Sequence, residues 1–257
     1  MFDFAPDIRR HVIGGSSSTI SPVMFEGLLL WLDGADETKI TRDESDLVSL
    51  WEDKSENGNN ASQGTGSAQP TYVAGSLNGL SSLDFDGSSD YMEFDSEMSE
   101  LECSVFLVVN FEDDITSGTA GQIIIGPKTT VSARVDLRVG SASGTIAGEV
   151  LTATIINGGT EFRYTVTNIS AGTRLIRYVN SAADITTVHV DGTPQSVLTS
   201  GSSSNGGFLG IQRLCRNRDA FTTYFNGILR EIIVYDRKLT DDETSLVESY
   251  INNKWGI

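Results

Sequence analysis

Cysteine and histidine are both scarce in this sequence of 257 residues, which contains two of each. Cys103 and Cys215 are too few for a disulfide framework, and a chain without an export signal keeps its thiols reduced, so we expect both to be unpaired. His11 and His189 lie far apart, and neither has cysteine or carboxylate neighbours at the spacing of a zinc site. The sequence therefore predicts no zinc centre.

Long apolar runs and positive charge are also lacking. No run approaches the ~18 consecutive apolar residues that a membrane-spanning helix needs, so we expect no membrane insertion. Lysine and arginine number 18 against 35 aspartates and glutamates, which gives a formal net charge of −17. Such a charge repels phosphate backbones, so nucleic acid is not an expected partner. There is no P-loop, nucleophile elbow or dinucleotide fingerprint either.

The first residues differ in character from the rest, and we expect residues 1–24 to form an arm and hinge. They lack the basic and apolar regions of a secretory signal, so export by that route is not expected. Apolar and charged side chains alternate up to a Gly/Ser stretch at Gly14–Ser18. This pattern predicts a segment that docks on a partner, with the alternative that it packs on its own domain or frays. The docking side chains would be Phe2, Phe4, Ile8, Arg9, Arg10 and Val12.

From residue 25 to 257 the pattern is that of one all-β domain. Short runs rich in β-branched and aromatic residues are separated by turn residues, and 26 glycines are available to turn corners. The expected strands are 28–32, 47–51, 83–87, 91–94, 104–111, 122–125, 135–139, 150–156, 162–166, 175–179, 186–190, 206–211 and 225–235. So many short strands in one chain predict a two-sheet antiparallel sandwich.

One helix is expected at the end of the chain. Thr240 and Glu243 form a capping box, in which a hydroxyl and a carboxylate satisfy backbone N–H groups at the first turn. Acidic residues fill that first turn and Lys254 lies near the last one, as the helix dipole favours.

Four segments in order resemble the concanavalin A-like, laminin-G-type jelly roll found in phage structural proteins and bacterial adhesins. They are Leu30–Asp36, Trp51–Ala61, Leu83–Tyr91 and Phe225–Leu239, and the last runs into the terminal helix. The resemblance covers residues 27–257 and implies a jelly-roll sandwich. Glu56 departs from the pattern, because such proteins often have glycine there. The functions in this family include glycan binding, adhesion, virion attachment and, in distant relatives, glycan hydrolysis, so the fold alone does not select one.

The resemblance directs attention to two sets of acidic residues. Glu93, Asp95 and Glu97 alternate along an expected strand, which would place them on one face. Laminarinase-type hydrolases of this fold use a similar Glu-x-Asp-x-Glu strand as nucleophile and acid/base. Here no tryptophan-rich cleft accompanies it, so we expect a protein that is not an enzyme. Laminin-G-type domains often carry calcium at the rim of the sandwich, and the candidate ligands here are Asp33, Asp36, Asp86 and Asp90. The alternative is that these four residues are ordinary turn and surface aspartates.

An adhesin-like fold without an export signal suggests a virion protein that is assembled in the host cytoplasm. We expect a head-decoration or tail-fibre component, held by its arm to other virion proteins and displaying a lectin-like domain toward surface glycans, with display favouring a homo-oligomer. The alternative is an extracellular or cell-surface glycan-binding module of bacteria, and the third hypothesis is a glycoside hydrolase. No cofactor is required by these hypotheses, and calcium is the one considered. Tryptophans Trp31 and Trp51 lie in apolar runs and are expected in the core rather than under a sugar.

Overall fold

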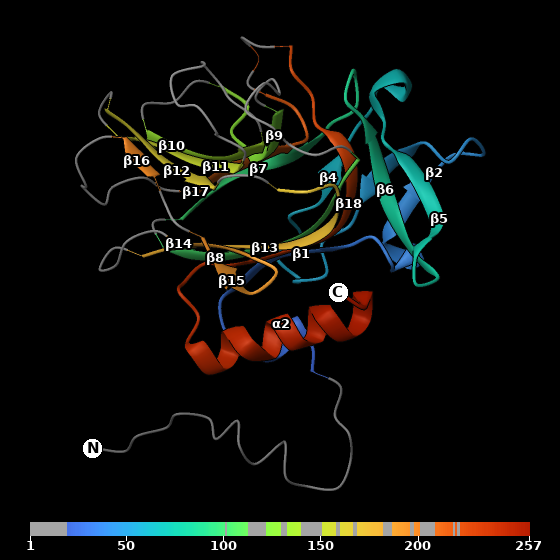
Figure 1. Cartoon of the computed structure of the whole chain (residues 1–257). Helices are drawn as coiled ribbons and strands as arrows, with labels where there is room; N and C mark the ends of the chain where they lie inside the picture. The colour runs from blue at the N-terminus through green and yellow to red at the C-terminus, as the bar shows by residue number, and fades with distance from the viewer. Residues whose placement is uncertain are drawn as a thin grey trace, which may run out of the picture.

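A computed structural model describes residues 20–100, 102–112, 122–129, 133–139, 151–157, 160–166, 169–181, 187–195, 198–200, 209–217, 219 and 222–257. Two β-sheets are stacked on each other, and helix α2 (Asp241–Trp255) crosses the outer face of one of them (Figure 1). The prediction of a two-sheet sandwich with one C-terminal helix is confirmed. No helix in these segments is long and apolar enough to cross a membrane. The docking residues Phe2, Phe4, Ile8, Arg9, Arg10 and Val12 lie outside the described residues.

The sheet that carries the helix, called the first sheet below, has eight strands in the order β15-β14-β13-β8-β18-β6-β5, with β1 paired to β18. Its strands are β1 Leu28–Asp33, β5 Thr71–Leu77, β6 Leu80–Asp86, β8 Cys103–Phe111, β13 Gly172–Asn180, β14 Thr187–Val190, β15 Thr193–Pro194 and β18 Asn226–Tyr235. Strand β18 pairs along its length with β8, and its other side is shared by β6 and β1. It is therefore the central strand of this sheet.

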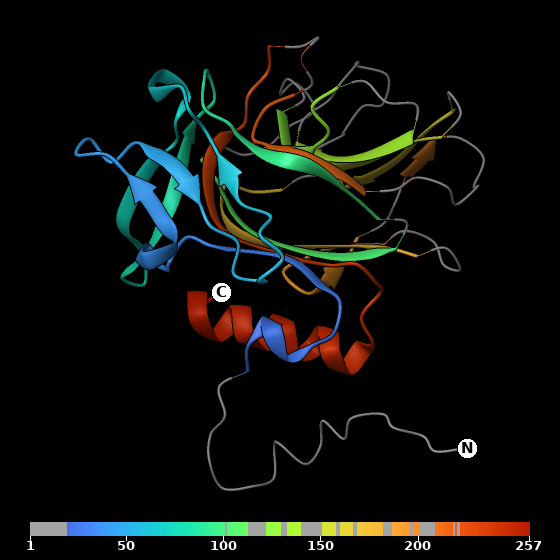
Figure 2. The same ribbon diagram turned by 180° about the vertical axis from the view of Figure 1, so that it is seen from behind.

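The second sheet has ten strands in the order β16-β12-β11-β10-β9-β17-β7-β4-β3-β2. They are β2 Ile40–Arg42, β3 Val48–Trp51, β4 Ala61–Ser62, β7 Met92–Glu100, β9 Gln122–Gly126, β10 Ala133–Val139, β11 Leu151–Asn157, β12 Thr160–Val166, β16 Leu198–Ser200 and β17 Leu209–Leu214. All pairings are antiparallel except one contact between β10 and β17. Short 3₁₀ turns occur at η1 Pro22–Met24, η2 Glu37–Lys39 and η3 Gly66–Ala68. Figure 2 shows the two layers from behind.

Each expected strand overlaps an observed one, although residues 150, 186 and 206–208 lie outside the described residues. The sequence patterns missed β2, β4, β5, β15 and β16. Most of these are very short. Strand β5 is longer, but its residues Ala74 and Gly75 are exposed and carry no apolar alternation.

Strand β8 is buried on both faces, which explains its continuous apolar sequence. Val105 and Leu107 point between the sheets, while Phe106 and Val108 point to the opposite face and pack beneath α2. A strand covered on both sides shows no polar alternation. The helix therefore acts as a third layer over the first sheet.

A buried carboxylate fastens α2 to this sheet. Glu231 of β18 is 0% exposed and accepts hydrogen bonds from Trp31 Nε1 at 2.8 Å and Tyr250 Oη at 2.8 Å. Trp255 Nε1 of the last helical turn donates to it at 2.6 Å, and Lys254 Nζ lies 3.1 Å away. A buried charge is tolerated when it is paired and hydrogen-bonded in this way. The helix start is the expected one, since Thr240 Oγ1 accepts from Glu243 N at 3.2 Å.

The residues just before the domain lie against it. Tyr235 Oη donates to Pro22 O at 3.0 Å, and Phe25 belongs to the apolar cluster under α2. Ile20 packs on the same cluster. The last part of the segment expected as arm and hinge thus rests on the helix side of the first sheet.

The polar loop after β3 is organised around Asp53. Its Oδ1 accepts from Trp31 N at 2.9 Å and Ser55 N at 2.9 Å, and its Oδ2 accepts from Asn59 N at 3.0 Å. Glu56 has a φ of 71°, in the left-handed region that favours glycine. Glu56 therefore has a backbone conformation that suits glycine, the residue often found there in the proteins that this segment resembles.

Candidate functional site

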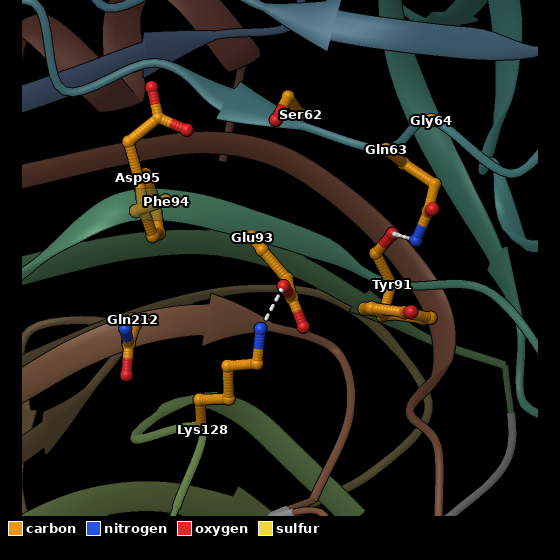
Figure 3. Close-up of a pocket in the computed structure, with 9 residues that line it drawn as sticks. All are labelled: Ser62, Gln63, Gly64, Tyr91, Glu93, Phe94, Asp95, Lys128 and Gln212. Atoms are coloured by element: carbon orange, nitrogen blue, oxygen red, sulfur yellow. Dashed lines mark hydrogen bonds and ion pairs between the residues drawn. The ribbon is translucent and has the colours of Figure 1, made fainter.

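A polar hollow of about 280 Å³ opens on the second sheet, where β4, β7 and β17 run side by side. Met92 and Phe94 of β7 are buried in the core between the sheets, so Glu93 between them is directed to the other face. Lys128 reaches the hollow from the turn after β9 (Figure 3). The lining comprises Ser62, Gln63, Gly64, Tyr91, Glu93, Phe94, Asp95, Lys128 and Gln212.

Glu93 carries the central negative charge of this hollow. Its Oε2 accepts from Lys128 Nζ at 2.7 Å, and its Oε1 accepts from Arg213 Nε at 3.0 Å. Burial alone would raise the pKa of Glu93, but the hydrogen bonds and charges of Lys128 and Arg213 outweigh burial and lower it. The carboxylate is therefore ionised at neutral pH, and in this state it has no proton to give as a general acid.

Arg213 is a buried side chain that holds Glu93 in position. The side chain is 1% exposed, its Nη1 donates to Asn217 O at 3.0 Å, and its Nη2 donates to Asp219 Oδ1 at 2.7 Å. The Arg213 hydrogen bond also lowers the pKa of Asp219. A buried guanidinium with two carboxylates and a carbonyl is a rigid support, because each N–H direction is fixed by the planar group.

The Tyr91 ring lines the hollow and is packed against a second tyrosine and a second arginine. The ring centroids of Tyr91 and Tyr224 are 6.4 Å apart. The guanidinium carbon of Arg216 lies 4.7 Å from the Tyr91 centroid and 5.5 Å from that of Tyr224. Tyr91 is held by its backbone, since Gln63 Nε2 donates to Tyr91 O at 3.1 Å (Figure 3). Tyr91 thus brings an amphipathic side chain to the hollow beside the charges of Glu93 and Lys128.

The three alternating carboxylates do not act together. Strand β7 is interrupted opposite β17, because Ile211 pairs with Met98 whereas Arg213 pairs with Glu93. Figure 3 shows Asp95 pointing away from Glu93 and Lys128. Glu97 lies over Gly210, where an added Cβ would be 2.7 Å from its Oε1. The simple alternation expected for this strand thus fails at the irregularity, and only Glu93 and Asp95 line the hollow.

The four calcium candidates form two pairs that are held by protein groups. Lys54 Nζ lies 2.8 Å from Asp33 Oδ2 and 2.8 Å from Asp36 Oδ2. Lys54 and Thr38 lower the pKa of Asp36 although burial opposes them. Within the described segments, no three His, Cys, Asp or Glu side chains gather in a way that could hold a metal ion. The cation beside Asp33 and Asp36 is a lysine ammonium.

The other pair organises the turn between β6 and β7. Asp86 Oδ1 accepts from the backbone N of Ser88 at 2.9 Å, Ser89 at 2.8 Å and Asp90 at 3.0 Å. Burial would raise the pKa of Asp86, but these hydrogen bonds lower it. Asp90, in contrast, has a pKa raised to about 6 by burial and by the charge of Asp86. These contacts are those of a turn aspartate.

The sequence predicts the buried tryptophans and the unpaired cysteines, whereas it does not predict most of the hollow. Trp31 and Trp51 are core residues, 7% and 0% exposed. Cys103 and Cys215 are buried and unpaired, and burial raises the pKa of the Cys103 thiol to about 12. The sequence does not predict Lys128 and Arg213 as site residues, because they come from segments that match no motif. They meet Glu93 only through the order of the strands.

The comparisons with known proteins concern the fold. No protein-family model matches this sequence, and no curated protein sequence is significantly similar to it. The structure is similar to an arabinofuranosidase solved with arabinofuranosyl-α-1,2-xylobiose, with 15% identity and a TM-score of 0.60; the match covers 88% of this chain and 59% of that one. It is also similar to domain 4 of AbnA, a GH43 extracellular arabinanase from Geobacillus stearothermophilus, in complex with arabinotriose, with 14% identity and a TM-score of 0.57. That match covers 87% of this chain and 97% of the domain.

A third match is a Trypanosoma rangeli sialidase, with 12% identity, a TM-score of 0.51, and coverage of 89% of this chain and 33% of that one. This chain thus spans less than two thirds of the arabinofuranosidase and one third of the sialidase. The expectation that the chain is not an enzyme is contradicted by these matches, because proteins of similar fold are an arabinofuranosidase, an arabinanase and a sialidase. At these identities the matches show a shared fold, and this fold occurs in glycan-hydrolysing proteins.

Proposed function

We propose that this domain binds a glycan in the polar hollow between β4, β7 and β17. The observation that carries the proposal is the Glu93–Lys128 pair at 2.7 Å beside the ring of Tyr91. A sugar hydroxyl both donates and accepts, so a carboxylate next to an ammonium serves two adjacent hydroxyls at once. The C–H face of the sugar ring is apolar and packs on an aromatic ring.

The rigidity of the site supports the same conclusion. Arg213 is buried and holds Glu93, and Gln63 holds the backbone of Tyr91, so little side-chain freedom is lost when a ligand arrives. Two proteins of similar fold were solved with arabinose-containing oligosaccharides, which makes arabinan and arabinoxylan the first glycans to try.

The test is affinity electrophoresis and calorimetry of the whole chain against a panel of soluble polysaccharides that includes arabinan and arabinoxylan. Lys128→Met is expected to weaken binding about tenfold by removing one charge-assisted contact. Lys39→Met is the matched control, because Lys39 pairs with Glu52 at 3.1 Å and is as exposed as Lys128 but does not line the hollow. Equal losses for the two variants, or no glycan bound by the wild type, would overturn the proposal.

Two further readouts on the same samples address chemistry and metal. Release of new reducing ends from a bound glycan would show that binding is followed by hydrolysis. Binding measured with and without EDTA tests whether it needs calcium.

A finer proposal places the domain on a virion, attached to other virion proteins through residues 1–24. It is supported by the apolar and basic side chains of that segment and by the sandwich that follows it. Mass spectrometry of purified particles from the source culture tests it. Stoichiometric copies in particles, lost when residues 1–20 are deleted, are the expected result, and absence from particles would contradict it.

A further inference from the structure

Lys254 in the last turn of α2 lies between two buried carboxyl groups that the polar hollow does not use. Its Nζ is 2.5 Å from Asp33 Oδ1 and 3.1 Å from Glu231 Oε1. The side chains of Lys254, Asp33 and Glu231 are 16%, 6% and 0% exposed. Asp33 is the last residue of β1, so an amine and a carboxyl group that are 221 residues apart in sequence meet in one enclosed place.

Aromatic side chains surround this amine and the neighbouring Glu231. The ring centroid of Trp255 is 5.1 Å from Lys254 Nζ, and that of Tyr250 is 5.5 Å away. Burial disfavours the charged forms of amines and carboxyl groups alike, and it is the main cause that raises the pKa of Glu231. Glu231 therefore accepts a proton from the adjacent nitrogen at little cost.

A second lysine prepares the carboxyl group of Asp33 for attack. Lys54 Nζ lies 2.8 Å from Asp33 Oδ2, whereas Lys254 contacts Oδ1. When an amine adds to Cγ, negative charge develops on the oxygen that remains, and the Lys54 ammonium stabilises it there. Asp33 thus has a nucleophile beside one oxygen and a fixed positive charge beside the other.

From this arrangement we infer that Lys254 and Asp33 form an intramolecular isopeptide bond. The Lys254 ammonium first gives one proton to Asp33 Oδ1, which leaves a neutral amine and a neutral carboxyl group in contact. The amine attacks Cγ, Glu231 takes a second proton from the nitrogen and passes it to Oδ1, and Oδ1 leaves as water. The Nζ–Cγ bond forms, the Cγ–Oδ1 bond breaks, and the third proton stays on the amide nitrogen. Nothing is oxidised or reduced, and no further reactant is needed.

The fold supplies what this condensation lacks in water. Two groups held in contact react as if each were present at a very high concentration, and an enclosed place keeps water from hydrolysing the amide. The bond joins the last turn of α2 to the end of β1 and closes a covalent loop over residues 33–254. It is independent of the proposed glycan binding.

Intact-mass spectrometry of the purified wild-type chain tests the bond directly. The expected mass is lower than that of the sequence by one water molecule, and a full sequence mass overturns the inference. After digestion with trypsin, the fragments that contain Asp33 and Lys254 are expected as one branched peptide. A cyclic imide of Asp33 and Gly34 loses the same mass but leaves these fragments separate, and that result also overturns the inference.

Substitutions identify the reacting amine and the proton acceptor. Lys254→Arg keeps the positive charge but removes the reactive amine, so it is expected to have the full mass. Lys54→Arg is the matched control, because Lys54 contacts the same carboxyl group, and it is expected to keep the bond. Glu231→Gln, which cannot take up the proton, is expected to have the full mass.

Each of these results bears on the assignment. A mass deficit that persists in Lys254→Arg and is lost in Lys54→Arg overturns the role of Lys254. A deficit that persists in Glu231→Gln overturns the role of Glu231. The wild-type mass and the branched peptide decide whether the bond exists, even where circular dichroism shows a variant to be misfolded.

Discussion

The indole Nε1 of Trp255 donates a hydrogen bond of 2.6 Å to Glu231, which joins the last turn of α2 to the central strand of the first sheet. Glu231 is 0% exposed, and burial is the main cause that raises its pKa, with the Asp33 charge acting in the same direction and Lys254 against it. The terminal helix is thus held by a buried polar contact in addition to apolar packing.

Removal of this carboxylate is expected to destabilise the protein strongly. Glu231→Ala leaves the indole N–H groups of Trp31 and Trp255 and the Lys254 ammonium without their acceptor, at a cost of about 3–5 kcal/mol. Glu231→Gln keeps one carbonyl acceptor and is expected to lose less. Urea unfolding measures both free energies, and an unchanged midpoint for Glu231→Ala would contradict the assignment.

Much of the fold could be predicted because its determinants are local. A few adjacent residues are enough to predict each element, as in the apolar runs of β8 and β18 and the capping box of Thr240 and Glu243. The docking of α2 could not be predicted in the same way, because Trp31, Glu231 and Trp255 are distant in sequence and meet only when β1 pairs with β18. The candidate site could not be predicted for the same reason, because Glu93 lies in β7, Lys128 in the turn after β9 and Arg213 in β17.

Gly227 of β18 lies so close to a neighbouring backbone that it leaves no room for a side chain. Its φ is 148°, and an added Cβ would lie 2.4 Å from Asn110 O of β8. A glycine inside a strand often marks such a close approach. Gly227→Ala is therefore expected to destabilise the domain by about 2–3 kcal/mol, since Asn110 O and the ring of Phe225 both obstruct the methyl group. Gly66→Ala is the control, because nothing lies within 4 Å of its Cβ position. Thermal unfolding of both variants is the measurement, and equal melting temperatures would contradict the steric account.

Replacement of Glu56 by glycine is expected to stabilise the protein. Its φ of 71° costs an L-residue about 1 kcal/mol, and glycine adopts this conformation without a Cβ penalty. Glu56→Gly is expected to raise the free energy of unfolding by up to about 1 kcal/mol, while Glu56→Ala, which keeps the Cβ, is expected to give no gain. Equal effects of the two substitutions in urea unfolding would assign the change to the lost charge instead.

Asp90 is expected to lower stability at neutral pH. Its folded pKa of about 6 exceeds the usual value of 3.8, so the unfolded chain releases the proton first as pH rises. The resulting penalty is absent below pH 4, grows up to about pH 6 and is constant above it. Asp90→Asn keeps an acceptor for Asp86 N and is expected to gain ~1–2 kcal/mol at pH 7.5 and nothing at pH 4. A loss of stability at pH 7.5 with no change at pH 4 would show instead that the ionised form of Asp90 is needed.

Glu93 is expected to have the opposite pH dependence. Its folded pKa is lowered from 4.5 by Lys128 and Arg213, which outweigh the effect of burial. The stabilisation is then fully present above pH 4.5 and is lost as pH falls through the lowered folded value. Glu93→Gln removes it, so we expect the variant to be less stable than the wild type by about 1–3 kcal/mol at pH 7, because Arg213 keeps only Asp219 as a carboxylate partner. The difference should shrink steadily in urea unfolding series at decreasing pH. A difference that stays constant down to pH 2 would mean that shape, and not the charge of Glu93, holds Arg213 in place.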